Sequence, residues 1–412
     1  MKIILKLLIG LVVIAAIVAG GLYLQDPVFW KRYQLLTRHK GVLPQAGWEG
    51  SEFVVNGAAD HRLFELVEEQ ELTIPKDALQ QVREFAEQRN STSLLVWHKG
   101  KLQFREHFQD YDTQTNIVGK SMAKMVVSLV VARAIEQGFI AGLDESAATY
   151  LTEWKGTPKA EITVRNLLHM AAGFEKYYTL DFSPFGKFMR SYIGSKNESI
   201  MLNDYDLVDQ PGSKYDYSQV TSDLIGMLIE RATGKPYGQY LSESLIQPIG
   251  AQGGQVMMNR PNGLAHTGCC LLLPSESWLR FGILLANSGD VEGKQLFPQN
   301  WMQDFLMPSP TNSAFGLHIW LGKPYFERRS WSNPGEAKGF GVLHSEPYLA
   351  DDLFLFDGNG HQVVYIIPSE ELVIVRTGGW SRKEGFEWDN AYIPNTIIRG
   401  IRRTLEQQAD QL

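Results

Sequence analysis

Cysteine is almost absent from this chain of 412 residues: Cys269 and Cys270 are the only two, and they are adjacent. Two neighbouring cysteines form neither the spaced framework of a disulfide-rich domain nor a C-x-x-C metal site, so they say little about the redox compartment. The nine histidines include no H-E-x-x-H motif and no pair at metal-ligand spacing. We therefore expect no metal site.

An excess of positive charge is also lacking. Lys and Arg number 39 against 46 Asp and Glu, which gives a net charge of −7, and no run is strongly basic. This balance argues against nucleic acid as a partner. With 44% hydrophobic and 11% aromatic residues, the chain can bury a large core and is neither disordered nor a coiled coil as a whole.

A single long apolar run lies at the N-terminus. Leu7 to Leu24 form 18 residues without a charge, after Lys2 and Lys6. As a helix this run is about 27 Å long, close to the thickness of a bilayer core, so we expect residues 1–25 to anchor the chain in a membrane. The small residues before Gly21 leave a cleaved signal peptide as the alternative. The basic residues flanking the run are nearly balanced, so charge does not fix the orientation.

The rest of the chain divides into an extension and one large domain. Turn residues alternate with short apolar pieces over residues 26–75, which we interpret as a linker and N-terminal extension. The domain, residues 76–412, opens with apolar residues at helical spacing over 76–89, and a second such stretch follows over 121–140. Between these predicted helices, two β-rich runs around Lys99-Gly100 predict a β-hairpin.

Strand patterns return near the C-terminus, while the middle of the domain is mostly helical. Three β-rich runs and a final helix are predicted over residues 353–356, 362–367, 372–377 and 392–405. Residues 144–260 form the helical part. Strands at both ends of the domain imply one antiparallel sheet completed by distant segments. We therefore predict an α/β (α+β) fold in which helices flank this sheet and a helical lobe lies beside it.

Ser121-Met122-Ala123-Lys124 is the only Ser-x-x-Lys in the chain. Residues three apart share a helix face, so Lys124 can reach the Ser121 hydroxyl. Serine is a poor nucleophile until a neighbouring base takes its proton, and a lysine of lowered pKa can do so. One such tetrad is expected by chance in a chain of this length, but an apolar helix follows it, which suits a rigidly held, buried pair.

Two weaker elements lie further along the chain. Tyr215 and Tyr217 precede an apolar helix, and a tyrosine beside a Ser–Lys pair can shuttle a proton, its phenolic pKa lowered by the nearby cation. Gly358-Asn359-Gly360 lies between two β-rich runs, where backbone N–H groups can stabilise an oxyanion. Taken alone, the tyrosines favour core packing and the glycines favour a turn.

In this order, the three elements resemble the penicillin-recognising serine hydrolases, which include class C β-lactamases, DD-peptidases and related esterases and amidases. The similarity extends over about residues 75–405, through segments such as LLVWHKGKLQFREHF and PGSKYDYSQVTSDLIGMLIERATGKPYGQYL. The sequence GNGHQ and the Cys269-Cys270 stretch resemble most the branch of 6-aminohexanoate-dimer hydrolase and β-lactamase-like esterases. The resemblance implies the predicted fold and an acyl-enzyme mechanism without metal or organic cofactor.

The resemblance also implies roles for particular residues. Ser121 corresponds to the acylated nucleophile and Lys124 to its proton acceptor. Tyr217, and not Tyr215, takes the tyrosine position. The backbone N–H groups of Ser121 and of Asn359, directly after Gly358, correspond to the oxyanion hole.

Two departures from the family pattern concern substrate choice. Gln219 stands where the family has Asn or Ser, and its longer side chain can displace a substrate carbonyl. Phe356-Asp357-Gly358 stands where β-lactamases and peptidases have Lys-Thr-Gly or His-Thr-Gly. Without that cation, Asp357 is expected to repel a substrate carboxylate, although His361 can partly compensate. We therefore favour an esterase or amidase over a β-lactamase or carboxypeptidase, and keep a non-catalytic binding relative as a further alternative.

The resemblance suggests one more contact and a location. Tyr178 corresponds to a second tyrosine that assists the leaving amine, and the aromatic residues around it, from Phe174 to Tyr192, are core or line an apolar substrate pocket. His266 and His344 are isolated and receive no role. Because the family works outside the bacterial cytoplasmic membrane, we expect a single-pass inner-membrane protein whose catalytic domain is periplasmic and acts on a small or peptide-like ester or amide. The sequence does not determine the oligomeric state.

Overall fold

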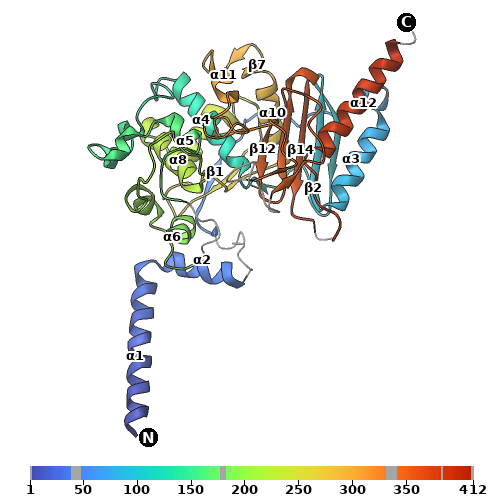
Figure 1. The fold of residues 1–412 in the computed structure, drawn as a ribbon. Coiled ribbons are helices and arrows are strands. Elements are labelled where there is room, and N and C mark those ends of the chain that lie inside the picture. Colours follow the sequence, from blue (N-terminus) through green and yellow to red (C-terminus); the bar gives the residue numbers. More distant parts are fainter. Residues whose placement is uncertain (1, 39–47, 177–181, 331–340, 382–383, 410–412) are drawn as a thin grey trace.

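Helices flank an antiparallel sheet, a helical lobe lies beside it, and a long helix projects from the N-terminus (Figure 1). This computed structural model describes residues 2–38, 48–176, 182–330, 341–381 and 384–409. The predicted α/β fold is confirmed.

The main sheet has six antiparallel strands in the order β3-β2-β14-β13-β12-β9. The hairpin predicted around Lys99-Gly100 and the three late strands are all present. Strand β2 pairs with β14, so that Leu95 lies opposite Val375 and the sheet is completed by distant segments, as expected. The strands are β2 (Ser91–His98), β3 (Lys101–His107), β9 (Trp320–Leu321), β12 (Phe354–Gly358), β13 (Gln362–Ile367) and β14 (Leu372–Gly378).

Helices cover both faces of this sheet. On one face lie α3 (Lys76–Gln88) and α12 (Tyr392–Ala409) (Figure 1), where the Phe85 and Tyr392 rings stack at 4.1 Å between centroids. The other face packs against α10 (Ser275–Ala286) and α4 (Met122–Glu136). The predicted second helix ends near Gly138 as expected, where the chain turns with a φ of 75°.

The helical lobe is centred on α8 (Gln219–Thr233), which packs beside α4. The Ser218 side chain caps its first turn by accepting a hydrogen bond from the Val220 N–H, and Gly234 ends it in the left-handed conformation with φ of 68°. The other α-helices after α4 are α5 (Val164–Leu168), α6 (Lys187–Ile193), α7 (Asn197–Ser199), α9 (Tyr237–Leu241) and α11 (Trp301–Leu306). Short 3-10 and π segments are η2 (Glu69–Glu71), η3 (Ala147–Thr149), η4 (Thr152–Trp154), η5 (Pro158–Glu161), η6 (Ile200–Asp204), η7 (Ser242–Ile246) and η9 (Pro368–Glu370).

A second antiparallel sheet, which the sequence analysis did not predict, joins the lobe to the N-terminal extension. Its order is β1-β5-β6-β4, so a strand from the extension lies at one edge and the strand that leads to Ser121 at the other. The strands are β1 (Glu52–Val55), β4 (Ile117–Val118), β5 (Gly254–Met257) and β6 (Leu271–Leu273). Two small hairpins are formed by β7 (Asp290–Val291) with β8 (Lys294–Gln295) and by β10 (Arg328–Arg329) with β11 (Val342–Leu343).

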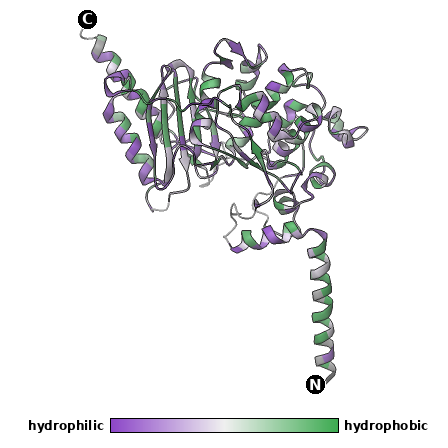
Figure 2. Cartoon of the chain, turned by 180° about the vertical axis from the view of Figure 1, so that it is seen from behind, coloured by the Kyte–Doolittle hydropathy of each residue, from purple (hydrophilic) through white to green (hydrophobic). Residues whose placement is uncertain are grey.

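The N-terminal helix α1 (Lys2–Gln25) projects away from the domain and is mostly hydrophobic (Figure 2). Its window Leu8–Gln25 has a mean hydropathy of 2.3 and no residue buried within the protein. Its length and composition therefore suffice to cross a membrane, a test that a signal sequence also passes.

Helix α2 (Pro27–Arg38) connects α1 to the domain at a turn formed by Asp26. The Asp26 carboxylate accepts hydrogen bonds from the Phe29 N–H at 3.0 Å and from the Ser195 N–H at 2.9 Å. The guanidinium of Arg32, on α2, is buried and donates a hydrogen bond to the Asn259 carbonyl at 2.8 Å. Part of the extension interpreted as a linker thus packs against the helical lobe.

Candidate active site

The segment that presents Ser121 is a sharp turn from β4 into α4. The Gly119 N–H donates to the Leu271 carbonyl at 2.9 Å, which continues the sheet. A Cβ on Gly119 would lie 2.3 Å from the Trp278 ring, so glycine is required there. Lys120 then has φ of 50°, in the left-handed region that a residue with a side chain rarely adopts. This turn places Ser121 at the N-terminal end of α4.

Lys124 lies one helical turn after Ser121, and its Nζ is 3.3 Å from the Ser121 Oγ. The amine is buried and also contacts two acceptors, the Gln219 Oε1 at 2.9 Å and the Gly268 carbonyl at 2.5 Å. Burial lowers its pKa to about 7, although the negative charge of Asp223 partly opposes this shift. A large fraction of Lys124 is therefore uncharged at neutral pH and able to accept the serine proton.

Tyr217 lies against the same pair. Its ring centroid is 5.2 Å from the Lys124 Nζ, and the ring stacks on Trp320 with 6.1 Å between the ring centroids. The expectation that a nearby cation lowers the tyrosine pKa is wrong. Burial dominates and raises the pKa of Tyr217, so the phenol stays protonated and acts as a proton donor. Tyr215 packs instead against Phe315.

The Gln219 side chain connects Lys124 to a carboxylate that the sequence analysis did not identify. Its Oε1 accepts from Lys124, and its Nε2 donates to the Asp223 Oδ1 at 3.1 Å. Asp223 is buried and also faces the Nδ1 of His266 at 3.4 Å, so His266 is not isolated. The signal in the sequence is the spacing of four between Gln219 and Asp223, which places both on one face of α8.

The glycine-bearing turn lies beside the turn that presents Ser121. A Cβ on Gly358, the last residue of β12, would lie 2.7 Å from the Gly119 carbonyl, so only glycine permits this approach. The Gln362 side chain fixes the same junction, because its Nε2 donates to the Val118 carbonyl at 2.6 Å. Asn359 follows Gly358 directly. Tyr178 falls outside the described residues.

Asp357 is paired with a cation that the sequence analysis missed. Asp357 and Arg329 form a buried ion pair, with 7% and 4% of their side chains exposed. The Arg329 guanidinium also lies over the Trp320 ring, 3.9 Å from its centroid. The expected repulsion of a substrate carboxylate by Asp357 is therefore offset by Arg329. Burial lowers the pKa of His361 to about 3, so its neutral ring cannot supply the missing cation.

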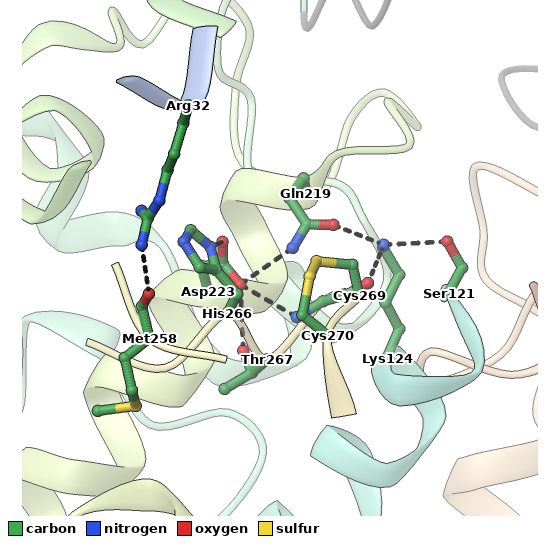
Figure 3. The surroundings of a disulfide bond; sticks show 11 residues. Arg32, Ser121, Lys124, Gln219, Asp223, Met258, His266, Thr267, Cys269 and Cys270 are labelled. Carbon is green, nitrogen blue, oxygen red and sulfur yellow. Dashed lines mark hydrogen bonds and ion pairs between the residues drawn. A yellow bond between two sulfur atoms is a disulfide. The ribbon is translucent and has the colours of Figure 1, made fainter. Parts of the chain in front are cut away.

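Cys269 and Cys270 form a disulfide with each other, a pairing that their adjacent positions did not predict. Figure 3 shows this disulfide beside Gln219 and Lys124. It begins one residue after Gly268, whose carbonyl accepts from the Lys124 amine. A bond between neighbouring cysteines leaves no signal in sequence spacing, since spacing arguments rest on separated pairs.

Known proteins resemble this chain in part of its sequence and in its fold. Residues 77–256 match the Beta-lactamase family model. Curated relatives include an Escherichia coli O157:H7 protein named "Putative D-alanyl-D-alanine carboxypeptidase", 29% identical over 114 residues, and Protein flp of Staphylococcus aureus (strain NCTC 8325 / PS 47), 23% identical over 168 residues. The matches cover 26% and 38% of this chain and 26% and 33% of those relatives, so only about a quarter to a third of their length is spanned.

Solved structures share the fold over most of the chain. The "Putative 6-aminohexanoate-dimer hydrolase from Bacillus anthracis" has a TM-score of 0.64 at 19% identity, covering 88% of this chain and 92% of that one. A class C β-lactamase has a TM-score of 0.55 at 16% identity, with 78% and 94% covered. The Beta-lactamase match over residues 77–256 and this shared fold agree with the resemblance of the sequence to the penicillin-recognising serine hydrolases.

Proposed function

We propose that this protein is a membrane-anchored serine hydrolase that cleaves an ester or amide through an acyl-enzyme. The observation that carries the proposal is the buried Lys124 amine, 3.3 Å from the Ser121 hydroxyl with a pKa of about 7. A lysine of ordinary pKa would be protonated and unable to accept the serine proton. Non-catalytic relatives have no chemical reason to keep a buried, neutral lysine beside a serine.

The mechanism follows from the protonation states of the site. Ser121 Oγ attacks the substrate carbonyl carbon while its proton passes to the Lys124 amine. Backbone N–H groups of Ser121 and Asn359 hold the oxyanion that forms. The Tyr217 phenol, kept protonated by burial, donates to the leaving oxygen or nitrogen and regains a proton from Lys124. Water then releases the acyl group from Ser121 by the reverse sequence of proton transfers.

The full-length chain in detergent tests this proposal through covalent labelling. A fluorophosphonate and, separately, a fluorescent penicillin are added, and mass spectrometry locates any adduct. We expect a fluorophosphonate adduct on Ser121. Ser128→Ala, which removes a buried serine hydroxyl two turns further along α4, is the matched control and should label like the native protein. The absence of any adduct would favour a non-catalytic binding protein.

The pH dependence provides a second prediction. Lys124 acts as the base, so activity is lost as pH falls through its pKa of about 7. We expect kcat/KM for hydrolysis of p-nitrophenyl butyrate to reach a plateau above pH 8 and to fall about tenfold per unit below pH 6. Rates are corrected at each pH with Ser121→Ala, which reports spontaneous hydrolysis. A profile that stays flat down to pH 5 would exclude Lys124 as the base.

Arg329 favours a second candidate function, a DD-peptidase or β-lactamase activity on carboxylate-bearing substrates. Its guanidinium neutralises Asp357 at the position where those enzymes carry Lys-Thr-Gly or His-Thr-Gly. The named function of the Escherichia coli relative agrees with this alternative. Labelling of Ser121 by penicillin, beside the fluorophosphonate, would make cell-wall or β-lactam chemistry the leading function.

We infer that the catalytic domain lies in the periplasm and that α1 spans the bacterial inner membrane once. A Cys269–Cys270 disulfide persists in an oxidising compartment and is rarely kept in the cytosol. Helix α1 is long and apolar enough for the span. The contacts of Asp26 and Arg32 with the lobe would hold the domain close to the membrane surface.

A further inference from the structure

Asp223 is a buried carboxylate that the mechanism above does not use. It lies on α8 with 1% of its surface exposed, one helical turn after Gln219. Figure 3 shows the groups that surround it. The Gln219 Nε2 donates to its Oδ1 at 3.1 Å, the Gly268 N–H donates to the same oxygen at 3.0 Å, and the His266 Nδ1 faces its Oδ2 at 3.4 Å.

These contacts determine which way the Gln219 amide points. A side-chain amide has an acceptor oxygen and a donor nitrogen, and a half-turn exchanges them. A carboxylate only accepts hydrogen bonds, so the nitrogen of Gln219 must face Asp223. The oxygen of Gln219 is then left facing the Lys124 amine, at 2.9 Å.

The direction of the amide matters because of the lone pair on Lys124. A neutral amine has two N–H donors and one lone pair. Gln219 Oε1 and the Gly268 carbonyl accept the two donors, which leaves the lone pair for the third neighbour, the Ser121 hydroxyl. If the Gln219 amide were reversed, its N–H would compete with Ser121 for that lone pair.

The peptide groups of Gly268 are hydrogen-bonded to both Asp223 and Lys124. Its N–H donates to Asp223, and its carbonyl accepts from Lys124. A Cβ on Gly268 would lie 2.4 Å from the Gln219 Nε2, so a side chain there would displace the amide. Asp223 therefore fixes both acceptors of the Lys124 amine, one through a side chain and one through a peptide group.

We propose that Asp223 is a positioning residue that orients Gln219 and Gly268 so that the lone pair of Lys124 faces the Ser121 hydroxyl. This inference rests on the proposed function, because it assigns a part in the same site. Asp223 also acts through its charge, which raises the pKa of Lys124. Tyr217 also faces Lys124, and the charge of Lys124 acts on His318 through space. Burial raises the pKa of Tyr217 and lowers that of His318 to about 3, so both are neutral near pH 7.

The test is Asp223→Asn in the full-length chain, with the rate of fluorophosphonate labelling measured from pH 5 to 9. An asparagine can donate as well as accept, so the Gln219 amide is no longer held in one direction. We expect the plateau rate to fall by about tenfold to a hundredfold. Because removal of the charge lowers the pKa of the base, we also expect the acid limb of the profile to move to lower pH by about one unit.

Asp389→Asn is the matched control. Asp389 is another buried carboxylate, and it accepts from the Ser345 and Ala391 N–H groups at 3.1 and 3.0 Å. Its neutralisation should leave both the plateau rate of labelling and the acid limb of the pH profile unchanged. If Asp223→Asn leaves either the plateau rate or the acid limb unchanged, the positioning role is overturned. If the native chain itself is not labelled, it is the proposed function that fails.

Gln219→Leu keeps the proposal testable if Asp223→Asn does not fold. It removes the oriented oxygen but keeps the Asp223 charge, so the plateau should fall while the acid limb does not move to lower pH. An unchanged plateau would overturn the proposal. Gln219→Glu in the Asp223→Asn background supplies a carboxylate that can only accept from Lys124. This double variant should recover part of the plateau and return the acid limb toward higher pH.

Discussion

Lys124→Met is expected to reduce ester hydrolysis and fluorophosphonate labelling by about a hundredfold to ten-thousandfold. Methionine has nearly the length of lysine but cannot accept the proton of Ser121. Because the amine is buried and shares its hydrogen bonds with Gln219 and Gly268, no water-exposed base can easily take its place. The measurement is kcat/KM for p-nitrophenyl butyrate at pH 8, beside the labelling rate.

Lys159→Met is the control for this substitution. Lys159 is a half-buried lysine whose pKa is also lowered by burial, and its Nζ donates to the Leu202 carbonyl at 2.8 Å. It does not contact the described residues of the candidate site, so the variant should retain native activity. Labelling of Lys124→Met at more than a tenth of the native rate would show that another group serves as base.

Much of the fold was predictable because local patterns and the final sheet agree. The apolar spacing over residues 76–89 and the turn at Lys99-Gly100 each specify an element on their own, and α3, β2 and β3 form where expected. The second sheet was not predictable in this way. Its strand β4 is two residues long and β6 three, so neither has a readable period, and both depend on neighbours distant in sequence.

The residues of the candidate site also differ in how far the sequence could predict them. Ser121 and Lys124 are one helical turn apart, so their proximity could be inferred from α4 alone. The spacing on α8 places Asp223 beside Gln219, but its contact with Gly268 on another segment could not be inferred from that helix. Arg329 left no such signal, because it acquires its role from Asp357, which is distant in the sequence. The direction of the Tyr217 pKa shift was mispredicted for a related reason. A neighbouring charge can be inferred from the sequence more readily than the degree of burial. Burial is the larger influence on the pKa of Tyr217.

Arg329→Ala is expected to destabilise the protein by about 3–5 kcal/mol. The substitution leaves Asp357 as a buried carboxylate without its cation, on a strand in the main sheet. It also removes the guanidinium from the face of Trp320. The free energy of unfolding is measured by urea titration of the full-length chain in detergent, followed by tryptophan fluorescence.

The exposed pair of Arg403 and Asp77 provides the comparison. Its side chains are 50% and 53% exposed, so Arg403→Ala should cost less than about 1 kcal/mol. For the buried pair, adding Asp357→Asn to Arg329→Ala should recover most of the lost free energy of unfolding. The double variant no longer carries the buried, unpaired carboxylate of Asp357. A double variant no more stable than Arg329→Ala would mean that packing of Arg329 on Trp320, and not its charge, carries the effect.

The pH dependence of the Arg329→Ala penalty separates charge from packing in a second way. Burial raises the pKa of Asp357, and Arg329 opposes that rise. Without Arg329, the carboxyl group of the folded protein binds its proton more tightly than that of the unfolded chain. The stability of the variant is then favoured at pH values below this raised pKa and lost as pH rises through it. We therefore expect the penalty relative to the native protein to be smaller at pH 5 than at pH 8, whereas a packing defect at Trp320 would cost the same at both.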